Sequence, residues 1–147
     1  MEPSRGLQDF LGSDQQDNLT SLIARDTLTN ATVIVGARRS DSATDQLLAG
    51  PAFSRLIRAA RSTFDIIIID TPPVGPVVDS LYIANHADAI VFVTRWSSTS
   101  QQEAKHSVAS LTDAKRPDTD IIAVINQQDQ SRASYMRKYG DYYADAD

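Results

Sequence analysis

The chain has 147 residues, the length of one domain, and its composition (41% hydrophobic, 22% charged) is ordinary for a globular protein. The absence of cysteine excludes disulfides, thiolate metal sites and a cysteine nucleophile. A net charge of −5 with scattered basic residues argues against nucleic-acid binding. No apolar stretch approaches a membrane span and no secretory signal is recognised, so a cytoplasmic location is expected.

The first part of the chain predicts one short strand and one helix. Residues 1–30 are polar, apart from an amphipathic stretch around Leu19, Leu22 and Ile23. Residues 32–35 form a short strand candidate. After the Gly50-Pro51 break, apolar residues recur at helical spacing over 53–60, which predicts an amphipathic helix.

Three later segments predict buried strands: residues 64–70, 89–95 and 120–126. Each is rich in β-branched residues and none alternates cleanly, as is typical of parallel strands that are covered on both faces. Helical patterns lie between them, at 77–83 and again from a capping box of Ser100 and Glu103 onward. This order predicts a doubly wound, mainly parallel α/β sheet within residues 1–127.

The end of the chain differs from the rest. Residues 128–147 have no apolar periodicity, and we expect a flexible tail there. Four of the five tyrosines fall in it within nine residues, next to Asp, Gly, Lys and Ala: Tyr135, Tyr139, Tyr142 and Tyr143. Exposed tyrosines suit phosphoacceptors, since a phosphate adds about −1.5 to −2 charge. The alternative is a tail with incidental tyrosines, and the clustering favours the first interpretation.

Asp70 ends the four-isoleucine segment and is the strongest candidate functional residue. In open α/β sheets, ligands bind beyond the carboxyl ends of the strands. A carboxylate there can hold a Mg²⁺-bound water beside the phosphates of a nucleotide. Alternatively, Asp70 only accepts hydrogen bonds from the Thr71-Pro72-Pro73 turn. Spacing alone leaves both interpretations open.

Four parts of the chain carry a family pattern: "FDIIIIDTPPV", "DSLYIANHADAIVFVTR", "STSQQEAKHSVASL" and the tyrosine-rich tail. Together they resemble the cytoplasmic domain of the bacterial tyrosine kinases of the capsular and exopolysaccharide family, which is built on a MinD/ParA-like P-loop fold. "GLQDFLGS" resembles the family's Gly-Leu-x-Asp-x-Leu segment. The resemblance implies a Walker B role for Asp70, catalytic and bound to Mg²⁺ through water.

The resemblance also gives nucleotide-binding candidates. The related ATPases place an Asn that recognises the adenine edge where Asn126 stands, although Asn126 also suits a turn. Arg95 matches a family Arg, for which either a phosphate or carboxylate contact or a surface ion pair is open. Asp79 matches a family Asp at a helix start, where the helix dipole also explains it.

The largest departure from the family is a missing motif. Members carry a phosphate-binding loop, G-x-x-x-x-G-K-[ST], whereas this chain has six glycines and no Gly-Lys pair. We therefore expect an N-terminally truncated P-loop domain that begins after the family's second aspartate motif. Alone, it is expected neither to bind ATP with useful affinity nor to phosphorylate itself.

By resemblance, the intact enzyme is a homo-oligomeric ring that transfers the γ-phosphate of Mg-ATP to tail tyrosines of neighbouring subunits. A membrane polysaccharide co-polymerase (a chain-length regulator) and a cognate tyrosine phosphatase are the implied partners, in control of polysaccharide synthesis and export. The chain is then peripheral to the inner membrane. Two rivals stay open: a non-catalytic interaction or acceptor module, and a fragment of a MinD/ParA-type partitioning ATPase, for which the tyrosine tail has no purpose.

Overall fold

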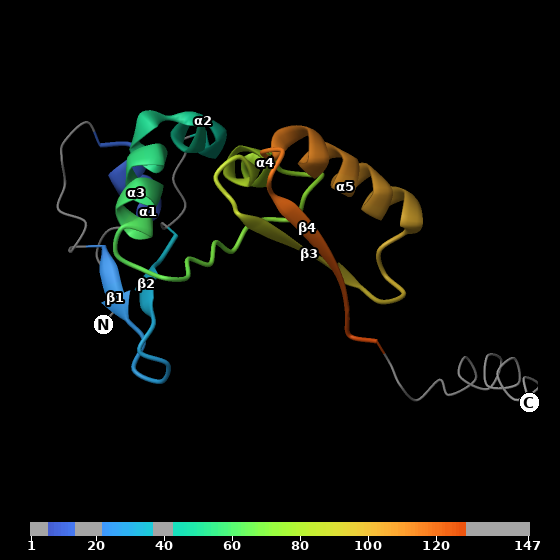
Figure 1. Cartoon of the computed structure of the whole chain (residues 1–147), viewed down its shortest axis with the longest axis horizontal. Coiled ribbons are helices and arrows are strands. Elements are labelled where there is room, and N and C mark those ends of the chain that lie inside the picture. Colours follow the sequence, from blue (N-terminus) through green and yellow to red (C-terminus); the bar gives the residue numbers. More distant parts are fainter. Residues whose placement is uncertain (1–5, 14–21, 37–42, 129–147) are drawn as a thin grey trace, which may run out of the picture. The chain divides into compact units, whose positions relative to one another are not determined.

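The structure is a computed structural model that describes residues 6–13, 22–36 and 43–128 (Figure 1). The described residues fall into two compact units. The first comprises the described residues up to Ala87 together with 114–117, and the second comprises 88–113 and 118–128. The four tail tyrosines and Leu19 lie outside the described residues.

The first unit contains four helices: α1 (Leu7–Leu11), α2 (Thr44–Ala49), α3 (Pro51–Arg61) and α4 (Asp79–Ala84). The helix predicted over 53–60 is confirmed as α3. Its start follows from the sequence, since Gly50 is the N-cap and Pro51 supplies the fixed φ that suits the first helical position. Two arginines, Arg58 and Arg61, stand in its last turn, where cations favour the helix dipole.

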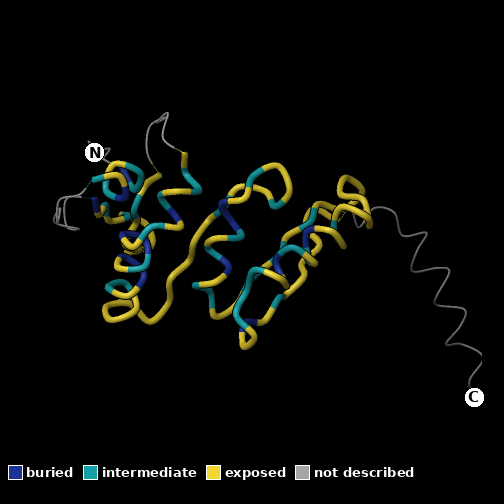
Figure 2. The backbone as a smooth tube through the Cα atoms, turned by 90° about the horizontal axis from the view of Figure 1, so that it is seen from above, coloured by how far each residue is buried: buried dark blue, intermediate teal, exposed yellow. Residues whose placement is uncertain are grey.

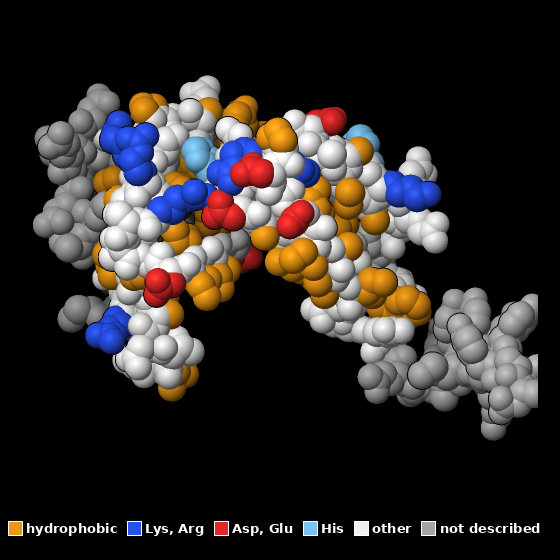
Figure 3. Space-filling view, viewed as in Figure 1, with side chains coloured by type: hydrophobic (Ala, Val, Ile, Leu, Met, Phe, Trp, Pro, Cys, Tyr) orange, Lys and Arg blue, Asp and Glu red, His pale blue; other side chains and the backbone are white. Residues whose placement is uncertain are grey.

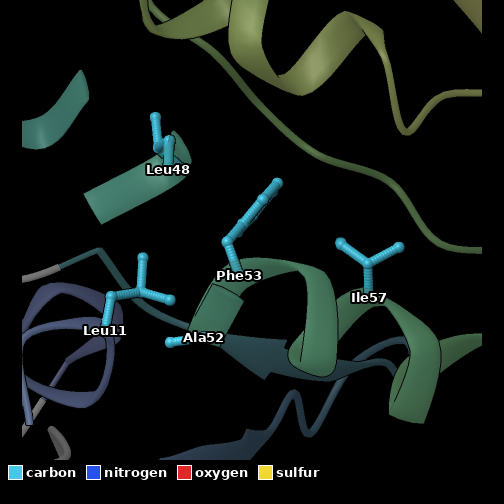
Figure 4. Packing of buried hydrophobic residues seen from close by; sticks show 5 residues of the cluster. All are labelled: Leu11, Leu48, Ala52, Phe53 and Ile57. Carbon is cyan, nitrogen blue, oxygen red and sulfur yellow. The ribbon is translucent and has the colours of Figure 1, made fainter. Parts of the chain in front are cut away.

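The core of this unit forms where α1, α2 and α3 meet. Five buried hydrophobic residues make the cluster: Leu11, Leu48, Ala52, Phe53 and Ile57 (Figure 4). Phe53 is only 2% exposed and is the largest fully buried side chain in the described part of the chain. The apolar spacing of α3 therefore serves to hold two shorter helices against it.

A small antiparallel hairpin completes the first unit. Strand β1 (Ile23–Arg25) pairs with β2 (Thr32–Ile34), with Ala24 opposite Val33. The turn is held by the Asp26 carboxylate, which accepts a hydrogen bond from the Thr29 N–H at 2.9 Å. The short strand expected at 32–35 is confirmed, and its antiparallel pairing adds a feature that the sequence did not indicate.

The second unit is a βαβ element. Strands β3 (Ala89–Arg95) and β4 (Asp120–Asn126) are parallel and in register from Ala89↔Asp120 to Arg95↔Asn126, with α5 (Gln101–Ala114) between them in the chain. The predicted capping box is confirmed, because the Ser100 N–H donates to Glu103 Oε2 at 2.9 Å and the Glu103 N–H donates to Ser100 Oγ at 3.1 Å. The α/β class is confirmed with one parallel strand pair.

The strand predicted at residues 64–70, here called the isoleucine segment, does not form. Asp65 lies at a bend and residues 66–70 have no regular secondary structure. Within the described residues the segment pairs with no strand, and all seven of its residues are exposed (Figure 2). An extended segment becomes a strand only when its N–H and C=O groups meet those of a neighbour. Within the described residues, the one hydrogen bond of this segment is from the Phe64 N–H to the Ala60 C=O, at 2.9 Å.

The expectation that β3 and β4 are covered on both faces is also wrong for the described residues. Side chains such as Val91, Val93 and Ile125 are exposed, and hydrophobic side chains gather over these strands on the surface (Figure 3). Parallel strands are buried when helices lie on both sides of a wider sheet. Here each sheet of the described residues has two strands, which is too narrow for that arrangement.

No helix in the described part of the chain combines the length and apolar character that crossing a membrane requires.

Candidate functional site

Asp70 ends the isoleucine segment as an exposed carboxylate. Within the described residues it accepts no hydrogen bond, including none from the turn that follows it. The sequence explains part of this, because Pro72 and Pro73 have no N–H to offer. The carboxylate oxygens of Asp70 are therefore accessible to a cation or to an ordered water.

A tight turn follows Asp70 in the sequence. Val74 and Val77 form an isolated bridge around Gly75, whose φ of +124° is a conformation that side chains rarely adopt. Helix α4 begins two residues after Val77, at Asp79. The turn lies between Asp70, whose carboxylate is exposed, and a second carboxylate, Asp79, which is buried.

That second carboxylate, Asp79, is 9% exposed and has a defined partner. Its Oδ1 accepts a hydrogen bond from the Thr44 hydroxyl at 3.0 Å. Thr44 is the first residue of α2 and Asp79 the first of α4, so the bond joins the starts of two packed helices. Asp79 also lies in the first turn, as the sequence suggested for a helix-dipole interaction. Its role here is structural.

Arg95 and Asn126 are brought together, because they are the last register pair of the parallel strands β3 and β4. The Asn126 Oδ1 accepts a hydrogen bond from the Gln127 N–H at 2.8 Å, and the Asn126 C=O accepts one from the Trp96 N–H at 2.9 Å. Asn126 thus has the turn contacts that one interpretation expected. Its amide NH₂ makes no hydrogen bond within the described residues, so those donors are free for a ligand.

Arg95 is exposed, and no ion pair of its side chain occurs among the described residues. Its backbone C=O, by contrast, accepts hydrogen bonds from the Ser98 and Thr99 N–H groups, both at 3.3 Å. The backbone is therefore fixed at the end of β3 while the guanidinium stays available. Of the two interpretations of Arg95, the surface ion pair is not seen in the described part of the chain.

The fit to a magnesium ion is limited to one group. Within the described ranges, no three His, Cys or acidic side chains lie close enough to hold a metal together. The exposed carboxylate of Asp70 has the chemistry that suits a Mg²⁺-bound water, since Mg²⁺ keeps several waters and takes one or two carboxylates plus phosphate oxygens.

His86 is a polar feature that the sequence did not single out. Its ring lies edge-on to Phe53 at a centroid distance of 5.3 Å, and its backbone C=O accepts a hydrogen bond from Arg61 Nη2 at 2.9 Å. Partial burial, followed by the charges of Arg61 and Arg116, lowers the pKa of His86 below its usual range. The neutral imidazole therefore belongs to the packing around Phe53.

Tyr82 stands among apolar residues of the helix predicted over 77–83, a sequence setting that predicts a shielded side chain. It lies in α4 as predicted, but its side chain is 40% exposed. Ile83 packs against the core cluster and Ala84 is buried, whereas Tyr82 is partly exposed on the same helix. Burial therefore does not exclude Tyr82 as a phosphoacceptor.

These observations define an α/β protein with a parallel βαβ unit and an accessible carboxylate after an apolar segment. No protein-family model matches the chain. It is 32% identical over 123 residues, 75% of its length, to the succinoglycan biosynthesis transport protein ExoP of Rhizobium meliloti. It is 34% identical over 96 residues, 65% of its length, to the tyrosine-protein kinase CpsD of Streptococcus agalactiae.

A third relative matches almost the whole chain. The tyrosine-protein kinase CpsD of Streptococcus pneumoniae serotype 4 is 29% identical over 139 residues, which is 95% of the chain. The chain is thus a homologue of the bacterial tyrosine-protein kinases of the exopolysaccharide family, and the resemblance noted in its motifs is confirmed. It covers 15%, 41% and 57% of these three relatives, in the order given.

Proposed function

We propose that the chain carries the metal-associated carboxylate and the acceptor tyrosines of a tyrosine kinase of the capsule and exopolysaccharide system. The observation that carries the proposal is the match to the pneumococcal kinase over 95% of the chain. An alignment of that extent necessarily includes part of the tyrosine-rich segment 128–147. The family likeness therefore reaches into the segment that carries the proposed acceptors.

Within a complete enzyme, Asp70 would hold a water of the Mg²⁺ that accompanies ATP, and the ion would supply charge neutralisation at the phosphates. A tail tyrosine oxygen forms a bond to the γ-phosphorus while the bond from that phosphorus to the β–γ bridging oxygen breaks and ADP leaves. The phenolic proton passes to Asp70 or to water. An accessible carboxylate without protein hydrogen bonds, as Asp70 is within the described residues, suits both tasks.

Arg95 and Asn126 are proposed as nucleotide contacts in the same enzyme. They share one end of the β3–β4 pair, and ligands of parallel sheets bind at the carboxyl ends of strands. The free guanidinium suits a phosphate oxygen, and the free Asn126 amide donors suit a ring nitrogen of adenine. Both contacts orient the nucleotide and neither takes part in bond breaking.

The chain by itself is proposed to accept phosphate on its tail tyrosines and not to catalyse the transfer. Phosphoryl transfer depends on positioning and on charge stabilisation around the γ-phosphate, which the family assigns to backbone amides and a lysine of the G-x-x-x-x-G-K-[ST] loop. The chain contains no Gly-Lys pair. An acceptor needs only an accessible tyrosine, so phosphorylation by a separate kinase is expected.

The proposed partners are those of the capsule and exopolysaccharide system. A polysaccharide co-polymerase at the inner membrane, a ring of kinase subunits and a cognate phosphatase are proposed on the basis of the family. One of the relatives reported above is named for succinoglycan transport and two for tyrosine phosphorylation. None of these three names refers to partitioning, which favours the kinase family over a MinD/ParA-type partitioning ATPase.

The test uses the purified chain with Mg-ATP, with and without a catalytically active kinase of this family. We expect phosphotyrosine only when the kinase is present, and mass spectrometry should place it on Tyr135, Tyr139, Tyr142 or Tyr143. A variant with these four tyrosines changed to Phe should lose the signal. The matched control is Tyr82→Phe, which should keep it. Phosphate that survives the fourfold change and disappears in Tyr82→Phe would contradict the proposal.

A further inference from the structure

Helix α3 carries an arginine row, made of Arg55, Arg58 and Arg61, on the side that faces away from the core cluster. The three residues are spaced by three, which places them on one side of a helix at intervals of about 4.5 Å along its axis. All three are exposed, whereas the buried residues of α3 take the opposite side. Basic side chains gather over this helix in the space-filling view (Figure 3). The arginine row therefore follows from the packing of α3 inside the first unit.

The charge of the arginine row is not balanced within the helix. Helix α3 contains no Asp or Glu, although the whole chain has a net charge of −5. Arg55 and Arg58 form no ion pair within the described residues. Arg61 is anchored, because its Nη2 donates to the His86 C=O at 2.9 Å. The helix dipole accounts for cations in the last turn, which holds Arg58 and Arg61, but not for Arg55 in the middle of the helix.

The composition of the row indicates the chemistry of a ligand. A guanidinium binds phosphate or carboxylate oxygens through two parallel N–H bonds, which an ammonium group cannot do. A helix that lies in a lipid surface also inserts an apolar face. The apolar face of α3 is buried in the core cluster instead. The arginine row thus favours a ligand with several phosphate or carboxylate groups close together over a membrane.

One segment of the chain has this chemistry. Residues 141–147, "DYYADAD", hold three aspartates, no basic residue and two adjacent tyrosines, Tyr142 and Tyr143. The segment lies outside the described residues. Both tyrosines are among the proposed phosphoacceptors, and each phosphate adds about −1.5 to −2 charge. The phosphorylated segment is therefore complementary in charge to the arginine row.

We propose that the arginine row of α3 binds residues 141–147 when Tyr142 and Tyr143 are phosphorylated. Arg55 and Arg58 donate to the phosphate oxygens, and Arg61 adds positive charge from its anchored position. This inference rests on the proposed function, which supplies the phosphate on these tyrosines. A tail that is bound at α3 is shielded from a phosphatase, so the arginine row would prolong the phosphorylated state.

The binding is expected to be weak and sensitive to salt. Interactions between exposed charges are screened over about 8 Å at physiological ionic strength. Weak binding is sufficient here, because a segment tethered to its site reaches an effective concentration of about millimolar. The aspartates alone offer single charges, so the segment without phosphate should bind far less well.

Fluorescence anisotropy tests the proposal, with the full unphosphorylated chain and a labelled synthetic peptide of residues 141–147 that carries phosphate on both tyrosines. We expect the dissociation constant to rise about tenfold when Arg55→Gln and Arg58→Gln are combined, because both unpaired guanidinium groups are lost. Arg55→Lys with Arg58→Lys should give a smaller rise, since the charge stays and the paired N–H bonds are lost. The matched control is Arg25→Gln, which removes an exposed arginine from β1 and should leave the constant unchanged.

Three further measurements separate this ligand from others. A peptide without phosphate that binds as well as the phosphorylated one overturns the proposal, and so does a dissociation constant that the two Gln changes leave unaltered. Inorganic phosphate that displaces the peptide at an equal concentration overturns it in favour of a general anion site. Vesicles of phosphatidylglycerol that bind the chain through Arg55 and Arg58, while the peptide does not bind, overturn it in favour of a membrane.

The result is independent of the phosphotyrosine assay that tests the proposed function. The peptide carries its phosphates from synthesis, so its failure to bind rejects the arginine row as the site and leaves the acceptor role of the tail untouched. Absence of phosphate on the tail in the kinase assay rejects the acceptor role instead. Far-ultraviolet circular dichroism checks that each arginine variant keeps its helices.

Discussion

Helix α3 and the isoleucine segment follow each other directly in the chain and end in opposite states. In α3 the side chains Phe53, Leu56 and Ile57 are buried, whereas Ile66 and Ile68 a few residues later are almost fully exposed. A helix satisfies its backbone within itself and needs only one apolar face covered. A strand needs a partner for its backbone and cover for its side chains. Apolar content alone therefore does not determine burial.

The largest expected loss of stability comes from a substitution in the buried face of α3. Phe53→Ala should lower the free energy of unfolding by about 3–5 kcal/mol, because it removes the largest buried side chain and leaves a cavity. The matched control is Phe64→Ala in the isoleucine segment, where the same change removes a ring that is partly solvated and should cost far less. Urea denaturation followed by circular dichroism measures both. Equal losses in the two variants would show that α3 is not the centre of the core.

The contact between Thr44 and Asp79 gives the next effect. Thr44→Val keeps the side-chain shape but leaves the buried carboxylate without its hydroxyl donor, which should cost about 1–3 kcal/mol. Thr112→Val is the control, since the Thr112 hydroxyl is exposed and donates only to the Val108 C=O of its own helix. The same denaturation experiment applies. A neutral Thr44→Val variant would mean that water replaces the hydroxyl at Asp79.

Substitution of Asp70 tests whether the carboxylate at the end of the exposed segment takes part in catalysis. In a kinase completed with the family's phosphate-binding loop, Asp70→Asn should reduce tail phosphorylation at least about tenfold without a change in stability, since the metal-bound water loses its anionic partner. Asp65→Asn is the matched control, because it removes an exposed carboxylate from the other end of the same segment. Full activity in Asp70→Asn, measured as phosphotyrosine formed per minute, would assign Asp70 no catalytic role.

The contrast between helix and strand also explains what the sequence could predict. The face of α3 and the capping box of Ser100 and Glu103 are local patterns, and both are found as expected. Strands β3 and β4 were located correctly, and their parallel register brings Arg95 and Asn126 together. The pairing of residues 64–70 was predicted wrongly, because the sequence of a strand does not reveal whether a neighbour is present.

Other features depend on contacts between distant residues and were not predictable from one sequence. Thr44 and Asp79 are 35 positions apart, and Arg61 and His86 are 25 apart. No local pattern connects either pair. The sequence alone, by contrast, shows that Asp70 follows an apolar run. Asp70 is a candidate functional residue for that reason. Its proposed chemistry comes from the family and not from its surroundings in the structure.

The capping box gives a smaller effect in the second unit. Ser100→Ala removes the oxygen that accepts from the Glu103 N–H and should cost about 1 kcal/mol. Ser110→Ala serves as the control, because Ser110 lies within α5 and its hydroxyl donates to the His106 C=O, so Ala there should be neutral or slightly stabilising. Helix content against temperature measures both. Similar melting of the two variants would show that tertiary contacts alone hold the start of α5.

The smallest effect is the pH dependence of the core around Phe53. The pKa of His86 lies below its usual value of 6.5 in the folded chain, chiefly because burial disfavours the charged imidazolium, with Arg61 and Arg116 adding repulsion. The unfolded chain therefore binds a proton at higher pH than the folded chain does. Stability from His86 is complete above about pH 6.5 and falls as the pH drops through that value toward the lowered pKa.

His86→Gln should flatten this part of the stability curve, because the glutamine does not titrate. We expect the urea midpoint of the unchanged chain to fall more between pH 7.5 and pH 5.5 than that of the variant, by a modest amount since His86 is only partly buried. His106→Gln, on α5, should leave the slope as it is. If His86→Gln keeps the full slope, the contact between His86 and Phe53 does not depend on the neutral imidazole, and acid acts on the core through its carboxylates instead.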